Sequence, residues 1–161
     1  MKNLVSIIIP RHIHRVNEII NELKKFNLRI NVHSSRKKNL KNTDVYIVDT
    51  FGETQQFHEI SSSVFLGGSI IKRGGQNPLE AARYGAKILH GPNIDNFKDI
   101  YKQLKTLKIS KEITSPKKLA SEIVFKKNKN IGNNIKNIGT KILKETIKEL
   151  DSIINNELKK T

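Results

Sequence analysis

Residues 64–82 read Val64-Phe65-Leu66-Gly67-Gly68-Ser69-Ile70-Ile71-Lys72-Arg73-Gly74-Gly75-Gln76-Asn77-Pro78-Leu79-Glu80-Ala81-Ala82 and indicate a strand, a glycine-rich loop and a helix start. The apolar run ends at Gly67, which is typical of a short strand buried on both faces. Glycines let backbone N–H groups approach a ligand without a Cβ in the way. A helix start reached through such a loop is a candidate site for an anion such as phosphate.

The same helix start has a purely structural interpretation. Asn77 occupies an N-cap position, Pro78 the first helical position and Glu80 the third position after the cap, which together resemble a capping box. No Gly-Lys-Ser/Thr closes the loop, so it is not a Walker loop. The Gly-x-Gly-x-x-Gly spacing of a dinucleotide fingerprint is also missing. Phosphate binding and plain capping therefore both remain open from the local chemistry.

Apolar runs and helical periodicities alternate along the chain. Alternation of this kind predicts an α/β fold with a Rossmann-like parallel sheet and helices on both faces. Strands are expected at residues 4–9, 28–32, 45–48, 64–66 and 86–89, and helices at 13–25, 54–60, 78–84, 97–107, 116–124 and 135–158. Leu150 and the other apolar residues of the last helix form a stripe that we expect to face a core or to bridge domains.

Polar and glycine-rich segments follow the predicted strands. Arg11 follows the first, Gly52-Glu53 the third, Gly67-Gly68 the fourth and Gly91-Pro92 the fifth. Ligands of parallel α/β sheets bind outside the carboxyl ends of the strands. We therefore expect these segments to line one ligand-binding edge.

Composition narrows the classes of protein and partner. The 161 residues suffice for one domain with a core, no cysteine is present, and no segment approaches the run of about 18 apolar residues that spans a bilayer. The net charge of +15 favours nucleic acid or an anionic membrane surface as a partner, although solvated lysines alone explain it equally well. Aromatic residues are few and not interleaved with the basic ones, so no specific nucleic-acid partner is expected.

Four separated motifs together resemble the donor-site signature of the Kdo transferases. These enzymes move 3-deoxy-D-manno-octulosonic acid (Kdo) from CMP-Kdo to the lipid A precursor, lipid IVA, in lipopolysaccharide biosynthesis. The motifs are Pro10-Arg11-His12, Asp49-Thr50-Phe51-Gly52-Glu53, the glycine loop above, and Gly91-Pro92-Asn93 followed by Asn96-Phe97. The match covers residues 4 to 105 closely and the remaining tail loosely.

The resemblance implies an inverting, metal-independent glycosyltransferase that needs no cofactor. It implies donor binding by Arg11, His12, Gly52, Glu53, Gly67, Gly68, Ser69, Gly74, Gly75, Asn77, Glu80 and Asn96. Arg11 can offer a bidentate fork to a phosphate or carboxylate, or be an ordinary surface arginine. Glu80 is expected to accept hydrogen bonds from ribose hydroxyls, as acidic residues do in other nucleotide folds. Glu53, Asn77 and Asn96 can each be explained as helix caps instead.

Departures from the family pattern set further expectations. Relatives have two Rossmann-like domains facing each other (the GT-B arrangement), and the counterpart of the amino-terminal acceptor domain, with its catalytic base, is absent from these 161 residues. We expect residues 1–109 to be the CMP-sugar binding domain and residues 110–161 to be helices packing on it. The isolated chain is then expected to have no catalytic residue and to be inactive, as a fragment or truncated product. The parent enzyme is expected at the cytoplasmic face of the bacterial inner membrane.

A rival hypothesis from another class follows from the charge. The chain is then a non-catalytic basic module that binds nucleic acid or anionic membrane on a degenerate transferase fold. A strongly salt-dependent affinity for DNA or RNA that survives Glu80→Ala would favour this rival. Nucleotide binding that is lost in Glu80→Ala would favour the donor domain.

Overall fold

The computed structural model describes residues 4–35, 42–72 and 74–158. The chain divides into two compact units, residues 1–57 and 58–161, and each is described by itself. Each unit contains a three-stranded parallel sheet. The predicted α/β class with parallel strands is thus confirmed, with the strands divided between two hydrogen-bonded ladders.

The sheet of the first unit contains the first three predicted strands. β1 (Ser6–Ile8) and β2 (Ile30–Val32) flank β3 (Val45–Ile47), and both run parallel to it. α1 (Val16–Leu23) connects β1 to β2, with a 3₁₀ turn at each of its ends (Ile13–Arg15 and Lys24–Phe26). This β-α-β order is the crossover that parallel strands require.

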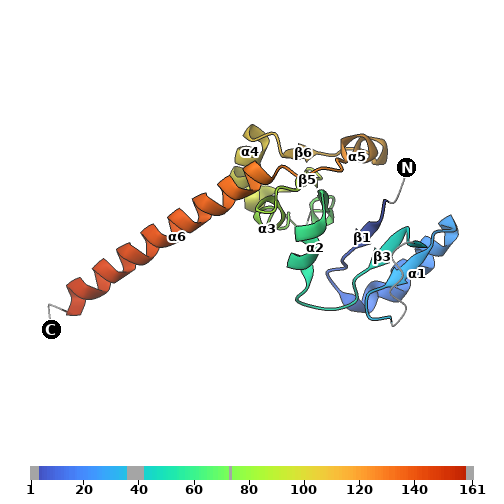
Figure 1. The fold of residues 1–161 in the computed structure, drawn as a ribbon, viewed down its shortest axis with the longest axis horizontal. Helices are drawn as coiled ribbons and strands as arrows, with labels where there is room; N and C mark the ends of the chain where they lie inside the picture. Colours follow the sequence, from blue (N-terminus) through green and yellow to red (C-terminus); the bar gives the residue numbers. More distant parts are fainter. Residues whose placement is uncertain (1–3, 36–41, 73, 159–161) are drawn as a thin grey trace. The chain divides into compact units, whose positions relative to one another are not determined.

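The alternation of side chains along β3 buries both faces of this sheet. Val45 and Ile47 pack on one face with the apolar side of α1, which lies beside the sheet in Figure 1. Tyr46 and Val48 pack on the other face with Phe57. Because successive strand residues point to opposite faces, a strand covered on both sides is apolar throughout.

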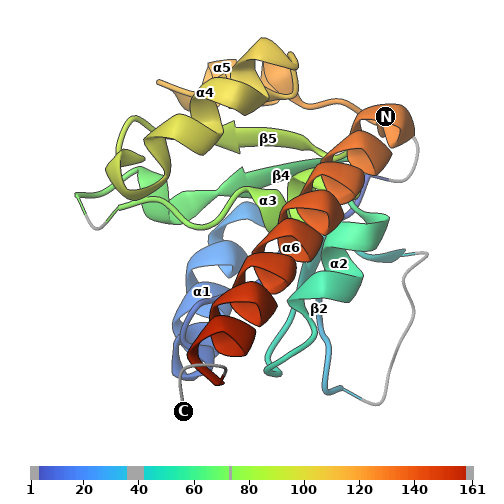
Figure 2. The ribbon, with the colours of Figure 1, turned by 90° about the vertical axis from the view of Figure 1, so that its left-hand side faces the viewer.

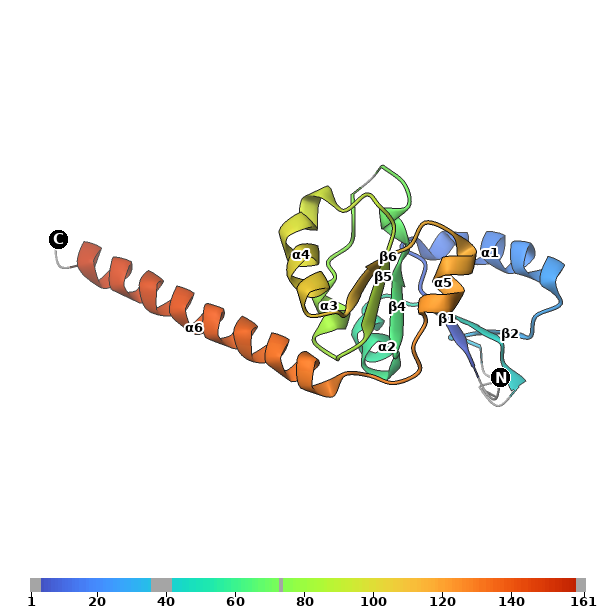
Figure 3. The ribbon, with the colours of Figure 1, turned by 90° about the horizontal axis from the view of Figure 1, so that it is seen from above.

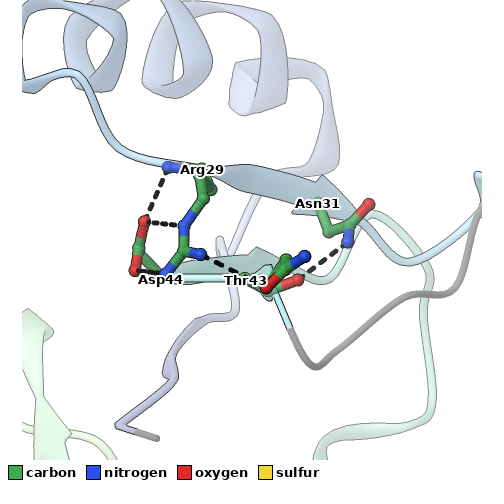
Figure 4. A network of polar contacts seen from close by, with 5 residues as sticks. Arg29, Asn31, Thr43 and Asp44 are labelled. Carbon is green, nitrogen blue, oxygen red and sulfur yellow. Dashed lines mark hydrogen bonds and ion pairs between the residues drawn. The ribbon is translucent and has the colours of Figure 1, made fainter.

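A polar network fixes the start of β2 to β3 (Figure 4). The guanidinium of Arg29 binds Asp44 with Nε to Oδ2 at 2.8 Å and Nη2 to Oδ1 at 2.7 Å. The backbone N–H of Arg29 donates to the same carboxylate, and Asn31 donates to Thr43 at 2.8 Å. These bonds to Arg29 hold the pKa of Asp44 well below its usual range. The bidentate geometry aligns the two strands side by side.

The second unit begins within α2 (Thr54–Ile60) and contains the second sheet. β5 (Lys87–His90) lies between β4 (Ser63–Leu66) and β6 (Ser110–Glu112), with all three parallel. Figure 3 shows α3 (Leu79–Ala82) and α4 (Lys98–Thr106) on one side of this sheet and α5 (Pro116–Glu122) on the other. Short 3₁₀ turns occupy Gly67–Ser69 and Asp95–Phe97.

The core of the second unit lies between its sheet and the helices α3 and α4. The buried cluster contains Leu66, Ala81, Ala82, Ala86, Ile88, Tyr101, Leu104 and Ile109. Ala81 and Ala82 of α3 are fully buried, and their small side chains let α3 approach the sheet closely. Ser115 caps α5 by accepting from the N–H of Lys118 at 3.2 Å, as the Ser115-Pro116 pair predicts.

Two elements differ from the sequence-based expectation. β6 lies in a region where only helices were expected. Its sequence does not indicate a strand, because the pairing with β5 uses backbone groups and only Ser110 of its three residues is buried. The helix expected at residues 78–84 is the single turn α3, because Tyr84 and Gly85 bond three residues back rather than four and Gly85 has a φ of +76°. Gly85 therefore ends the helix, as expected, but after fewer residues.

The last helix, α6 (Lys129–Leu158), is one continuous helix in Figures 1 and 2. Its first turns pack on the core of the second unit through Ile131 and Ile135. From Ile138 onward its apolar side chains are about half exposed or more, with Ile138 at 57% and Leu143 at 60%. The stripe was expected to face a core or to bridge domains: the first part faces a core, and bridging stays a prediction for the exposed remainder.

Candidate functional site

The glycine-rich loop after β4 is held in place by one asparagine. Asn96 Oδ1 accepts from the N–H of Gly75 at 2.8 Å, and Asn96 Nδ2 donates to the carbonyl of Gly75 at 3.1 Å. Gly74 has a φ of +78°, and a Cβ there would stand 2.8 Å from Asn96 Oδ1. Only glycine combines this backbone angle with this close approach.

A second set of bonds joins the start of the same loop to the segment after β5. Ser69 is fully buried, and its hydroxyl donates to the carbonyl of Leu66 at 2.5 Å and accepts from the N–H of Gly91 at 2.6 Å. Asn93 Nδ2 donates to the carbonyls of Ser69 and Ile70 at 3.1 and 3.0 Å. The hydroxyl of Ser69 is thus used within the fold and faces no solvent.

The two joined segments enclose a surface hollow of about 420 Å³. Its lining consists of Lys72, Gly74, Asn93, Asp95 and Asn96. Lys72 is exposed and brings a positive charge to the rim, while the two asparagines bring amide groups. A volume of this size lies within the range of about 300–1,000 Å³ usual for small-molecule sites. The ammonium group of Lys72, the carboxylate of Asp95 and the two amides make the lining polar but without net charge, so it suits a polar ligand whose anionic group lies on the Lys72 side.

A buried polar cluster lies at the end of β5. His90 Nδ1 lies 2.7 Å from the carbonyl oxygen of Gly91, and its ring centroid lies 4.3 Å from that of Tyr101. Burial lowers the pKa of His90 and raises the pKa of Tyr101 to about 12. Both groups are therefore neutral at pH 7 and serve as packed core side chains.

The helix start after the loop has the local geometry of a cap. The N-cap residue of α3 is Pro78, one position later than the expected Asn77, and Asn77 Oδ1 accepts from the N–H of Leu79 at 3.0 Å from just before the cap. α3 is only four residues long, so it offers no helix dipole for a phosphate. The side chain of Glu80 is exposed on this turn, and its role toward a ribose stays a prediction.

The first unit contains the other four predicted site residues. Arg11 and His12 follow β1 and are exposed, and the rings of His12 and His14 stack with centroids 5.4 Å apart. Gly52 has a φ of +84° at the turn after β3. Glu53 binds His33 Nε2 at 3.0 Å and accepts from the hydroxyl of Thr50. The carboxylate of Glu53 is thus engaged within its own unit, just before α2 begins.

The structure brings part of the predicted set together. Asn96 binds Gly75, a Cβ on Gly74 would meet Asn96 at 2.8 Å, and a Cβ on Gly68 would stand 3.7 Å from the carbonyl oxygen of Gly74. Ser69 belongs to the same loop but points inward. The roles of the whole predicted set as donor contacts stay predictions. In the part of the chain that the structure describes, no group of three or more His, Asp or Glu side chains is placed to hold a metal ion.

Three lining residues were not among the predicted site residues: Lys72, Asn93 and Asp95. Lys72 lies in the glycine loop beside Arg73, so a basic pair between two glycine pairs was the available signal. Asn93 was part of a quoted motif, but nothing local indicated that its side chain reaches back to Ser69 and Ile70. Its role depends on a contact across more than 20 residues of sequence.

Comparisons with known proteins agree with the motif resemblance. No family model matches the chain. Residues of the chain are 42% identical over 96 positions to a 3-deoxy-D-manno-octulosonic acid transferase of Rickettsia prowazekii, covering 60% of the chain and 21% of that protein. They are 32% identical over 152 positions to the enzyme of Rickettsia conorii, covering 92% of the chain and 32% of that protein. The match to the Haemophilus influenzae enzyme is 34% over 102 positions, covering 63% of the chain and 24% of that protein.

A solved structure shares the fold. The crystal structure of the C-terminal CMP-Kdo binding domain of WaaA from Acinetobacter baumannii matches with a TM-score of 0.68 and 27% sequence identity, covering 73% of the chain and 62% of that domain structure. The chain spans about a quarter of the length of the curated relatives named above. The similarity therefore concerns one part of those proteins.

Proposed function

We propose that this chain, which is related by sequence and fold to the C-terminal domain of Kdo transferases, binds CMP-Kdo as the donor of a glycosyl transfer. The relatives are named as Kdo transferases, and the matching structure is named as a CMP-Kdo binding domain. The comparisons do not favour a basic nucleic-acid or membrane module. The parent activity is the transfer of Kdo to a lipid A precursor.

The observation that carries the proposal is the pair of asparagine contacts that shape the hollow. Asn96 holds Gly75, and Asn93 holds the carbonyls of Ser69 and Ile70. Ordering a loop before the ligand arrives reduces the entropy lost on binding. Lys72 then supplies a charge for the phosphate or carboxylate of the donor, and Glu80 supplies acceptors for ribose hydroxyls.

The proposal for the first unit rests on Arg11. Its guanidinium follows a strand end and is exposed, and a guanidinium can bind a phosphate or carboxylate through two parallel N–H bonds. His12, Gly52 and Glu53 are proposed to shape the donor surface of that unit. They would shape this surface without a bond from the Glu53 carboxylate to the donor, because that carboxylate is already bound to His33.

The acceptor and the location are also proposals. A phosphorylated lipid acceptor lies at a membrane surface, and a net charge of +15 favours attraction to anionic lipid. No helix in the described part of the chain is long and apolar enough to cross a membrane. We propose the cytoplasmic face of the inner membrane as the place where the parent protein acts.

Nuclear magnetic resonance tests the placement of the donor. CMP is titrated into the ¹⁵N-labelled chain, and amide shifts are followed residue by residue. We expect saturating shifts in residues 67–76 and 91–96 and none in α6 beyond Ile138, which serves as the internal control. Shifts confined to other segments, or an absence of saturation, would contradict the proposed site.

A further inference from the structure

Two glycines let the first turn of α6 lie against the segment that ends α3. A Cβ on Gly132 would stand 2.7 Å from the backbone nitrogen of Gly85, and one on Gly85 would stand 2.6 Å from the carbonyl carbon of Asn128. The N–H of Asn128 donates to the carbonyl of Gly85 at 2.8 Å. This contact fixes the start of α6 beside Arg83 and Tyr84.

A small hollow forms where these segments meet. It has a volume of about 170 Å³ and is lined by Arg83, Tyr84, Lys129, Asn133 and Lys136. The guanidinium of Arg83 and the ammonium of Lys136 lie 5.4 and 4.8 Å from the centroid of the Tyr84 ring. A volume well under the usual range of about 300–1,000 Å³ suits a single ionic group rather than a whole nucleotide.

The positive charge of this hollow is uncompensated within the described residues. Arg83, Lys129 and Lys136 take part in none of the ion pairs found among them, and no acidic residue lines the hollow. The Nε atom of Arg83 is buried without a hydrogen-bond partner there. A buried polar atom left without a partner is costly, so it indicates an unfilled partner position.

The surroundings add further positive potential. Lys127 binds the carbonyls of His58 and Glu59; burial lowers its pKa, the charge of Glu59 acts against this, and the charges of Lys129 and Lys136 lower it further. The first turn of the 30-residue helix α6 contains no acidic residue. Its helix dipole therefore adds to the attraction for an anion, since the N-terminal end of a helix is positive.

We propose that Arg83, Lys129 and Lys136 form a second anion site that binds a phosphate monoester, separate from the donor hollow. Arg83 supplies a planar fork, the two lysines supply point charges, and Asn133 supplies an amide donor. The phosphate can come from a phosphorylated lipid headgroup or from a free phosphate. Both share the dianionic group that three cations recognise.

Titration with inorganic phosphate at constant ionic strength tests the site. Amide shifts of the ¹⁵N-labelled chain are expected to saturate at Tyr84 and at residues 129–136. The double variant Arg83→Gln/Lys136→Gln should weaken the apparent affinity about tenfold or more, because each lost charge-assisted bond contributes substantially. The double variant Lys144→Gln/Lys148→Gln removes the same charge from exposed positions of the same helix and should leave the affinity unchanged.

Vesicles distinguish the two sources of phosphate. Sedimentation is measured with phosphatidylcholine vesicles that contain phosphatidic acid, a monoester, or phosphatidylglycerol, a diester, at matched surface potential. Preferential binding to phosphatidic acid that is lost in Arg83→Gln/Lys136→Gln supports the lipid headgroup as the source. Saturating phosphate shifts with equal binding to both vesicles support a free phosphate.

The proposal is overturned by either of two results. One is a phosphate titration without saturating shifts near Tyr84. The other is an equal loss of affinity in the two double variants, which would mean that net charge alone attracts phosphate. Circular dichroism and thermal midpoints confirm that each variant is folded. The Arg83→Lys variant keeps the positive charge but removes the guanidinium fork. If this variant is folded and binds phosphate with intermediate affinity, the weaker binding comes from the missing fork and not from unfolding.

Discussion

The side chain of Asn96 bonds both backbone groups of Gly75, with Oδ1 2.8 Å from the nitrogen and Nδ2 3.1 Å from the carbonyl oxygen. This pairing resembles the exchange of two bonds between neighbouring strands. It connects the glycine-rich loop to the segment after β5, 21 residues away in sequence. The shape of the proposed donor surface therefore depends in large part on this amide side chain, together with that of Asn93.

Replacing Asn96 by alanine should loosen the loop. We expect CMP affinity to fall about tenfold and the free energy of unfolding to fall by about 1–2 kcal/mol, because two hydrogen bonds to backbone groups are lost. Calorimetry and urea denaturation measure the two effects. Asn134→Ala, at an exposed position of α6, is the matched control: it should leave CMP affinity unchanged and should not lower stability, because alanine has the higher helix propensity. Unaltered CMP affinity in Asn96→Ala would contradict the proposed role of the Asn96–Gly75 bonds in shaping the donor surface.

Two alanine substitutions in the glycine-rich loop distinguish a glycine that the fold requires from one that contacts the ligand. Gly74 has a positive φ and lies against Asn96, so its replacement should destabilise the fold by about 1–2 kcal/mol or more. Gly67 has no neighbouring atom within 4 Å of an added Cβ, so Gly67→Ala should leave stability nearly unchanged. Weaker CMP binding by Gly67→Ala would then report direct contact with the donor. Thermal unfolding and CMP titration of both variants supply the readouts.

Two glycines of the same helix should respond in opposite directions. Gly139 is open to solvent in α6, so Gly139→Ala should stabilise the fold by about 0.5–1 kcal/mol. Gly132 is buried against Gly85, so Gly132→Ala should destabilise it despite the better helix propensity. Denaturant unfolding at one pH compares the two. Equal and positive effects of both substitutions would show that α6 is not anchored at this contact.

Stability should fall as the pH is lowered from about 7.5 to 5.5. His58 and His90 are buried, and burial lowers the pKa of each below the ordinary value near 6.5. In this window the unfolded chain binds more protons than the folded chain, so protonation favours unfolding. Urea denaturation across the window measures the slope. His90→Gln should make the slope shallower, whereas a stability that is constant or rises on acidification would refute this account.

Much of the architecture could be predicted because it depends on local patterns. The apolar residues of β3 and β4 indicated buried strands, and Gly85 indicated the end of α3. Asn77 accepts a bond from the N–H of Leu79, only two residues away, just before the helix start. Each of these features is set by neighbours in sequence, which is why composition and spacing were informative.

The parts that could not be predicted depend on distant contacts. β6 carries Lys111 and Glu112, and its ladder with β5 is made of backbone groups that no side-chain pattern reveals. The inward orientation of Ser69 depends on Gly91, 22 residues later. The hollow at Arg83 depends on a close approach of Gly132 to Gly85. A helix pattern also could not show that the stripe of α6 is exposed beyond Ile138.

Glu80 provides the most specific test of nucleotide recognition within the second unit. Its side chain is exposed on α3, so Glu80→Ala should leave the fold intact. CMP affinity should fall about tenfold or more, because a carboxylate that accepts from ribose hydroxyls forms charge-assisted bonds. Glu149→Ala, at an exposed position of α6, is the matched control. Unchanged CMP binding by Glu80→Ala would remove Glu80 from the donor site.

The central claim is that this chain binds the cytidine nucleotide of CMP-Kdo. Calorimetric titration of the purified, folded chain with CMP, UMP and GMP tests it most directly. We expect CMP to bind with measurable heat and 1:1 stoichiometry, and UMP and GMP to bind at least about tenfold more weakly. No binding of CMP, or equal binding of all three nucleotides, would contradict the proposed donor function.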